Sequence, residues 1–332
     1  MARALRIWLV LAMLALVATL AALMSGSGAI PAADVLRVLV HPDASTASEI
    51  VHQLRLPRAL AALATGALLS VAGALMQILL RNPLADPYVL GLSGGAATGA
   101  LGAMVAGAGV AGAHAGAFTG AVASMGIVLF FAHRDLGRID APGTLDASPR
   151  LLLTGVVLAA GWTAAVTLLL TLSPEEQLRG MLFWLMGDLG HADSFEPAII
   201  ALPVALALVY PFARELNVLL RGPVVAHALG VRVGFLRAVL YCTASIATAL
   251  AVTTAGTVAF IGLIVPHALR LAIGNDQRVL LPAAALAGGA LLLIADTAAR
   301  TVIAPQQLPV GVLTALIGVP TFMFLLLRKG AR

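Results

Sequence analysis

Long apolar runs dominate the chain, and short polar turns separate them. The run from Pro57 to Leu79 contains no charged residue and has about the 20 residues that a helix needs to cross a membrane. The same pattern predicts ten membrane-spanning helices, at about residues 7–24, 57–79, 89–109, 114–132, 151–172, 197–213, 238–254, 256–272, 280–298 and 309–327. We therefore expect an all-α, polytopic membrane protein with one transmembrane domain over residues 1–332.

Three of these spans need a separate argument. The first follows Arg3 and Arg6 like the apolar core of a signal peptide, but it is longer than the usual 7–15 residues, so we expect a retained helix. The seventh and eighth runs lie so close together that they could form one long element. Gly256, Gly262 and Pro266 favour a break between them.

The composition excludes a soluble protein. Hydrophobic residues make up 61% of the 332 residues and charged residues only 11%, with a mean hydropathy of +1.01, whereas soluble domains carry about 25% charged residues. The net charge of +5 is better explained by loop orientation than by nucleic-acid binding. The single cysteine, Cys242, excludes an intramolecular disulfide.

The basic residues predict the orientation. With both termini placed in the cytoplasm, 15 of the 20 lysine and arginine residues lie on the inner side. The five on the outer side are Arg37, Arg55, Arg58, Arg179 and Arg300. This bias agrees with the positive-inside rule.

Three segments are predicted to lie outside the spans. Residues 25–54 form an outer loop, and residues 173–196 form an outer re-entrant or interfacial helix that begins with a capping signature, Ser173 and Glu176. Residues 214–237 form the longest inner loop, which we interpret as two short amphipathic helices broken at Gly222 and Pro223.

Two absences narrow the function. A phosphate-binding P-loop needs a lysine followed by serine or threonine, but the only lysine, Lys329, precedes Gly330. We therefore expect no ATP hydrolysis, and no enzyme activity, in this chain. No Asp, Glu, Lys or Arg falls in the middle of a predicted span, which argues against a proton or sodium relay. The closest is Asp296, four residues before Arg300, a spacing that predicts an ion pair.

Several motifs together resemble one family. They are RLPR (55–58), GALLSVAGALMQ (66–77), RNPLADP (81–87), GLSGGA (91–96), GTVAFIGLIVPHALRL (256–271), NDQRVLLPAAALAG (275–288) and LPVGVLTALIGVPTF (308–322). In this order they resemble the membrane permeases of the ABC importers for vitamin B12, haem and iron-siderophores. The resemblance also supports a break between the seventh and eighth spans.

The resemblance implies a translocation pathway formed by a homodimer in the bacterial inner membrane, surrounded by lipid. Two cytoplasmic ABC ATPase subunits would bind ATP and Mg²⁺, and a periplasmic substrate-binding protein would deliver a ferric siderophore, haem or cobalamin. The chain itself would hold no cofactor and no metal; its seven histidines show no H-E-x-x-H spacing.

The outer arginines have two interpretations. Arg55, Arg58 and Arg300 could anchor helix ends at the lipid headgroups, or they could dock an acidic partner, because arginine pairs with carboxylates through two parallel hydrogen bonds. The resemblance favours docking, since the family places arginines here to receive glutamates of the binding protein.

The resemblance also assigns an inner surface and a gate. The inner loop would bind the ATPase subunit through Arg221, His227, Leu229, Gly230, Val231 and Arg232, although it could also be an ordinary connector. Asp146, Ala147 and Ser148 match the cytoplasmic gate of the family. Met181 and Trp184 on the outer segment could line the pathway or pack against neighbouring helices.

Glycines spaced four residues apart predict close helix contacts: Gly91, Gly95 and Gly99 in one run, and Gly112, Gly116 and Gly120 in the next. Gly91-Leu92-Ser93-Gly94 also matches the nucleophile motif of intramembrane serine proteases, for which His267 would have to act as the base. The alternatives to an importer subunit are therefore an ion-coupled carrier or channel and, remotely, such a protease.

Overall fold

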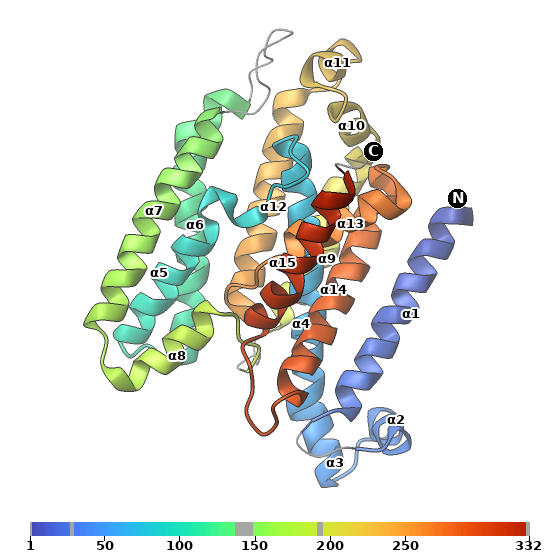
Figure 1. Ribbon diagram of the computed structural model, residues 1–332, viewed down its shortest axis with the longest axis vertical. Coiled ribbons are helices and arrows are strands. Elements are labelled where there is room, and N and C mark those ends of the chain that lie inside the picture. Colours follow the sequence, from blue (N-terminus) through green and yellow to red (C-terminus); the bar gives the residue numbers. More distant parts are fainter. Residues whose placement is uncertain (1, 27–29, 137–148, 191–194, 330–332) are drawn as a thin grey trace.

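The computed structural model describes residues 2–26, 30–136, 149–190 and 195–329. Helices account for the regular structure throughout these residues, and no β-strand occurs among them (Figure 1). Seven helical segments are long and apolar enough to cross a membrane: Ala2–Met24, Thr46–Leu79, Gly109–His133, Leu151–Leu172, Glu196–Leu219, Val233–Ala255 and Gln277–Thr301. Three shorter apolar helices are Leu92–Val105, Ile261–Ile273 and Val310–Phe324.

These segments correspond to helices α1 (Ala2–Met24), α4 (Leu56–Leu79), α5 (Leu92–Val105), α6 (Gly109–Leu136), α7 (Pro149–Leu172), α9 (Glu196–Val209), α12 (Val233–Ala255), α13 (Ile261–Ile273), α14 (Gln277–Thr301) and α15 (Val310–Lys329). Every one of the ten predicted spans therefore contains an apolar helix. The polytopic helical fold is confirmed, whereas the number of membrane crossings stays a prediction.

Helix α4 lies at the centre of the protein. In its most apolar stretch, 89% of the residues are buried, compared with 11% in α7 and 17% in α1. Helices α9, α12, α13 and α14 pack around it. The approach is close because α4 presents small residues: Gly66 meets the backbone of Gly288, and Gly73 meets that of Gly262.

Helices α5, α6 and α7 form a second group beside this core (Figure 1). Gly95 and Gly99 of α5 face Gly120 and Gly116 of α6. Gly112 of α6 makes no such contact, because a Cβ atom added there would meet only Ala108.

One buried polar chain fastens this second group. The Ser124 hydroxyl of α6 donates to the Gly91 carbonyl oxygen (2.9 Å) and accepts from the Trp162 indole nitrogen of α7 (3.1 Å). Gly91 itself has a φ of +77°, because it ends the short 3₁₀ helix η2 (Pro87–Leu90) and precedes α5. Its backbone therefore turns into α5 at a position that favours glycine.

The remaining helices are short and lie at the two ends. At one end are α2 (Ala32–Val40), α3 (Thr46–Glu49), the π-helical turn η1 (Ile50–Arg55) and α8 (Glu175–Leu185). At the other end are η3 (Tyr210–Phe212), α10 (Ala213–Leu219) and α11 (Pro223–Ala228), near which both ends of the chain also lie (Figure 1).

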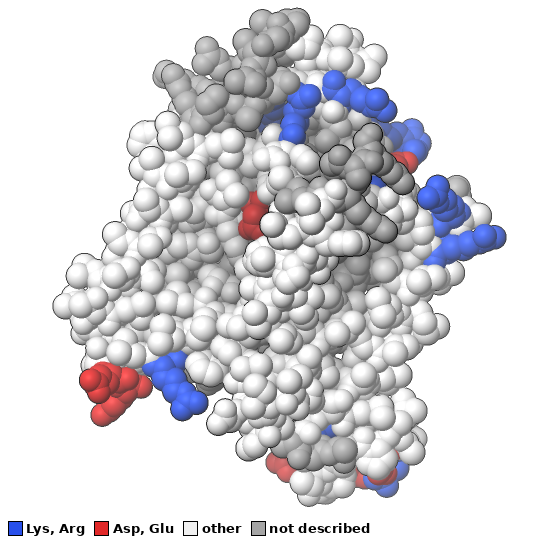
Figure 2. Space-filling view, viewed as in Figure 1, with Lys and Arg blue, Asp and Glu red and all other residues white. Residues whose placement is uncertain are grey.

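Charged side chains are also distributed unequally between the two ends and the middle of the molecule. Basic side chains gather around the end that holds α10 and α11, while the middle of the visible face shows little charge (Figure 2). Since basic loops stay on the cytoplasmic side, we refer to this end as the inner end and to the end with α8 as the outer end.

Two sequence expectations need correction. The capping signature at Ser173 is wrong: α8 begins after Pro174, and the Ser173 hydroxyl donates to the Leu169 carbonyl oxygen of α7 instead. The break between the seventh and eighth spans is present, but Pro266 does not cause it. Pro266 lies inside α13, and the chain turns at Gly256 (φ +65°) and Phe260 (φ +71°).

Candidate functional site

The three predicted outer arginines come together in space. Arg55 ends η1, Arg58 lies in the first turn of α4, and Arg300 lies in the last turn of α14. All three line one cavity of about 330 Å³ at the outer end. Gln53, Gly190 and Gln307 also line this cavity, which we call the arginine pocket.

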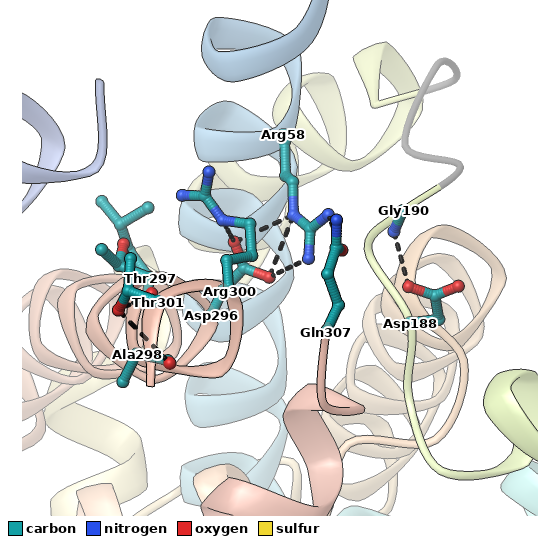
Figure 3. A network of polar contacts seen from close by, with 10 residues as sticks. Arg58, Asp188, Gly190, Asp296, Thr297, Ala298, Arg300, Thr301 and Gln307 are labelled. Carbon is teal, nitrogen blue, oxygen red and sulfur yellow. Dashed lines mark hydrogen bonds and ion pairs between the residues drawn. The ribbon is translucent and has the colours of Figure 1, made fainter. Parts of the chain in front are cut away.

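A buried carboxylate holds two of these arginines (Figure 3). The Asp296 side chain of α14 is fully buried and accepts from Arg58 Nη2 at 2.8 Å and Arg58 Nε at 3.1 Å. It also accepts from Arg300 Nε at 3.1 Å. The ion pair expected between Asp296 and Arg300 is therefore present, and Arg58 joins it from another helix.

Two further bonds in the pocket are made to uncharged groups. Arg58 Nη1 donates to the Gln307 side-chain oxygen at 2.9 Å, and Arg55 Nη1 donates to the Leu23 carbonyl oxygen of α1 at 2.7 Å. Three guanidinium groups against one carboxylate leave these four side chains with a net charge of +2. The arrangement suits an anionic group, because buried guanidinium groups bind carboxylates strongly when water is excluded.

The arginine pocket is not a ring of free surface cations. Arg55 is 6% exposed, and the side chains of Arg58 and Arg300 are 13% and 9% exposed. An incoming acidic group would therefore meet oriented donors rather than mobile side chains. Docking at these arginines stays a prediction.

A larger cavity of about 740 Å³ lies beside α8. Its walls come from α8, from the turn between α5 and α6, and from the end of α12, and they include Met181 and Trp184. Met181 is fully buried, whereas Trp184 is partly exposed. The lining also contains four ionisable residues to which the sequence assigned no role in the pathway: His114, Glu176, Arg179 and Asp188.

The inner end presents an exposed apolar surface. Leu229, just after α11, is 68% exposed, and Gly230 has a φ of +83°. Val231 instead packs against the hydrophobic core. The predicted surface residues Arg221, His227 and Arg232 are exposed, and the Arg232 guanidinium lies 5.2 Å from the ring centre of Phe235.

The sequence analysis missed several members of this inner surface. Val224, Val225 and Phe235 are 37%, 45% and 50% exposed. The signal was available, since three large apolar residues occur in a loop that the basic residues place outside the membrane. The predicted gate residues Asp146, Ala147 and Ser148 lie outside the described residues.

The candidate protease pair is placed on different parts of the fold. Ser93 lies in the first turn of α5, which packs mainly on α6 and α7. His267 lies on α13, which packs on α4 and α14, and its ring is 6.2 Å from that of Phe322. Within the described residues, no cluster of three or more His, Cys, Asp or Glu side chains could hold a metal ion.

The fold and these surfaces define a multi-pass helical membrane protein of the permease class. A sequence profile of the FecCD transport family matches residues 14–328, and the chain belongs to this family.

Two relatives illustrate the match. The chain is 42% identical over 291 residues to the cobalamin import system permease protein BtuC of Halobacterium salinarum, covering 86% of this chain and 76% of the relative. It is 40% identical over 284 residues to the vitamin B12 import system permease protein BtuC of Escherichia coli, covering 84% of each.

Solved structures agree with the fold. An inward-facing metal-chelate type ABC transporter has a TM-score of 0.81 at 28% identity, covering 97% of this chain and 99% of that one. PsaBC from Streptococcus pneumoniae, solved in complex with Fab, has a TM-score of 0.53 at 14% identity, covering 83% and 92%, and supports the fold alone.

Proposed function

We propose that this chain is the permease subunit of an ATP-driven importer that carries cobalamin or a metal chelate of similar size across the bacterial inner membrane. One observation carries the proposal. The same chain has a buried cationic pocket at its outer end and an exposed apolar loop at its inner end, joined by helices without charge at mid-span. The two relatives named for cobalamin or vitamin B12 import favour cobalamin as the cargo.

The working assembly contains two copies of this chain around a central pathway. Two ATPase subunits bind the inner loop around Leu229 and hold ATP and Mg²⁺, since this chain has a single lysine and no P-loop. A periplasmic substrate-binding protein docks at the arginine pocket. The cavity beside α8, with Met181 and Trp184, forms part of the outer pathway. This chain itself binds no cofactor and catalyses no reaction.

Tracer uptake tests the cargo. In a strain lacking this chain, we expect loss of radio-cobalt cobalamin uptake and its restoration when the chain is supplied. Uptake of radio-iron haem and of a ferric siderophore is measured in the same strain. Loss of uptake of one of these compounds, in place of cobalamin, would assign that compound as the cargo. Uptake that continues without the ATPase subunit and follows an ion gradient would indicate a secondary carrier and overturn the proposal.

Binding of the periplasmic protein tests the arginine pocket. Reversing both charges with Arg55→Glu and Arg58→Glu should weaken docking and leave membrane insertion intact, because two repulsive groups would face the incoming acidic side chains. Docking affinity that is unchanged at low salt would contradict the assignment.

A further inference from the structure

The buried carboxylate in the arginine pocket has an arrangement that simple attraction does not explain. Asp296 is fully buried, and its two oxygens accept from both Arg58 and Arg300. If the pocket only had to attract acidic groups, this negative charge would weaken it. Burying a carboxylate is also costly unless it is well paired. The presence of Asp296 among these arginines is therefore better explained by the geometry that it imposes on them.

The geometry links two helices. Arg58 belongs to α4, while Asp296 and Arg300 belong to α14, and these helices are in backbone contact at Gly66 and Gly288. Asp296 receives the Nε edge of each guanidinium group. The pairing fixes the plane of the Arg58 fork and the direction of the Arg300 side chain, neither of which a flexible arginine would hold alone.

One strong donor is left for a partner. Within the described residues, the Arg300 Nη2 atom is buried and has no hydrogen-bond partner. The Arg300 side chain is 9% exposed and lines the arginine pocket. A buried charged donor without a partner is expensive, and a carboxylate entering the pocket would supply the missing acceptor.

We propose that Asp296 is a positioning residue that orients Arg58 and Arg300 to receive one acidic side chain of the periplasmic binding protein. This inference rests on the docking role proposed above and adds a residue that does not touch the partner. The negative charge of Asp296 weakens the attraction of the pocket for acidic groups, but its hydrogen bonds hold the arginine donors in place. Asp296 therefore affects the dissociation rate of the complex more than the association rate.

The test is Asp296→Asn in the full permease, reconstituted in lipid nanodiscs with its ATPase subunits. The probe is the purified periplasmic binding protein that restores uptake with this permease, and association and dissociation rates are measured separately. We expect the association rate to stay the same or rise, because the pocket gains net positive charge. The dissociation rate should rise about tenfold or more, because Arg58 and Arg300 lose their common anchor.

Asp34→Asn is the matched control. Asp34 lies on α2 at the outer end and pairs with Arg37 at 3.4 Å, with its side chain 44% exposed. Its replacement changes the net charge by the same amount without touching the arginine pocket. The control should leave the dissociation rate unchanged. A general loss of folding would instead reduce the bound fraction without changing the rate constants of the folded molecules.

Further variants separate the outcomes. If Asp296→Asn does not insert, Arg58→Lys keeps the charge but loses the fork that Asp296 orients, and it should also speed dissociation. Suppose that Asp296→Asn inserts and its dissociation rate is unchanged, while the double variant Arg55→Glu, Arg58→Glu weakens docking. That result would overturn the role of Asp296 and leave the docking role of the arginines standing. No effect of that double reversal would overturn the docking role and this inference together.

Discussion

Gly73 of α4 and Gly262 of α13 touch through their backbones, and a Cβ atom added to Gly73 would overlap the Gly262 carbonyl group. The contact occurs at the buried centre of the protein, where α4 is surrounded by α9, α12, α13 and α14. In a membrane, helices associate through close packing rather than through the hydrophobic effect, because lipid tails are as apolar as leucine. The missing side chains therefore create the contact.

Gly73→Ala should destabilise the protein. The added methyl group would meet a backbone carbonyl that cannot move without shifting α13, and overpacking a tight core usually costs about 1–3 kcal/mol. Thermal unfolding of the purified protein in detergent measures the loss. Gly102→Ala is the control, because the space around a Cβ atom there is open. Equal melting temperatures for Gly73→Ala and the wild type would contradict this account.

Ser124→Ala should loosen the group formed by α5, α6 and α7. The change leaves the partly buried Trp162 indole nitrogen without its acceptor, while the Gly91 carbonyl oxygen keeps only its bond from the Gly95 backbone nitrogen. An unsatisfied buried polar group costs about 1–3 kcal/mol, and partial exposure of Trp162 places the expected loss at the low end. A lower unfolding temperature and a shifted tryptophan emission, to which Trp162 contributes with Trp8 and Trp184, would report the change. Thr119→Ala, which removes a hydroxyl bonded only within α6, should have little effect on either measurement.

Leu229→Asp should prevent assembly with the ATPase subunit. Leu229 is the most exposed of the apolar residues around α11, and truncation of a central interface residue typically costs about 2 kcal/mol or more. Co-purification of the ATPase subunit and ATP-dependent uptake would both fall. Val40→Asp, at an equally exposed position on α2 at the outer end, should leave assembly intact. The same loss in both variants would point to a general defect.

Asp276 should make the inner end sensitive to acid. Hydrogen bonds from the Arg278 side chain, and then from Asn217, hold the pKa of this carboxyl well below its usual range. The ionised form therefore adds stability that is complete above the usual aspartate pKa of about 3.9 and is lost as the pH falls below it. The effect should be small, because the Asp276 side chain is 39% exposed.

Asp276→Asn isolates this charge. Asparagine can still cap the start of α14, where Asp276 now accepts from the Arg278 backbone nitrogen. Unfolding temperatures measured between pH 3 and pH 6 should therefore vary less in the variant than in the wild type. The same slope in both proteins would assign the acid sensitivity to other groups.

The sequence was sufficient for the positions of the helices. Each predicted apolar run contains a helix, because about 20 uncharged residues can satisfy their backbone in a membrane only as a helix. Apolarity could not reveal which helices are buried. Helices α4 and α7 are both apolar, yet 89% of the residues in the most apolar stretch of α4 are buried, compared with 11% in that of α7. Glycines such as Gly66 and Gly73 indicate that α4 is closely packed, but the helices that they contact are known only from the tertiary structure.

The site was predictable only in part. Arg55, Arg58 and Arg300 stood out because basic residues are rare on the outer side, and the structure places them in one pocket. The role of Asp296 as a partner of Arg58 was not visible, since 238 residues separate the two. The four-residue spacing revealed only the local pair with Arg300. Pairing between distant helices depends on their packing, which no local pattern encodes.

The burial of α4 has a consequence for biosynthesis. Three of its main neighbours, α12, α13 and α14, begin more than 150 residues further along the chain. A nascent chain therefore releases α4 into the bilayer long before the helices that enclose it exist. Until those helices are made, lipid must cover the glycine-lined faces of α4, and the arriving helices must then displace that lipid. The core around α4 can therefore be completed only when the last third of the chain is synthesised.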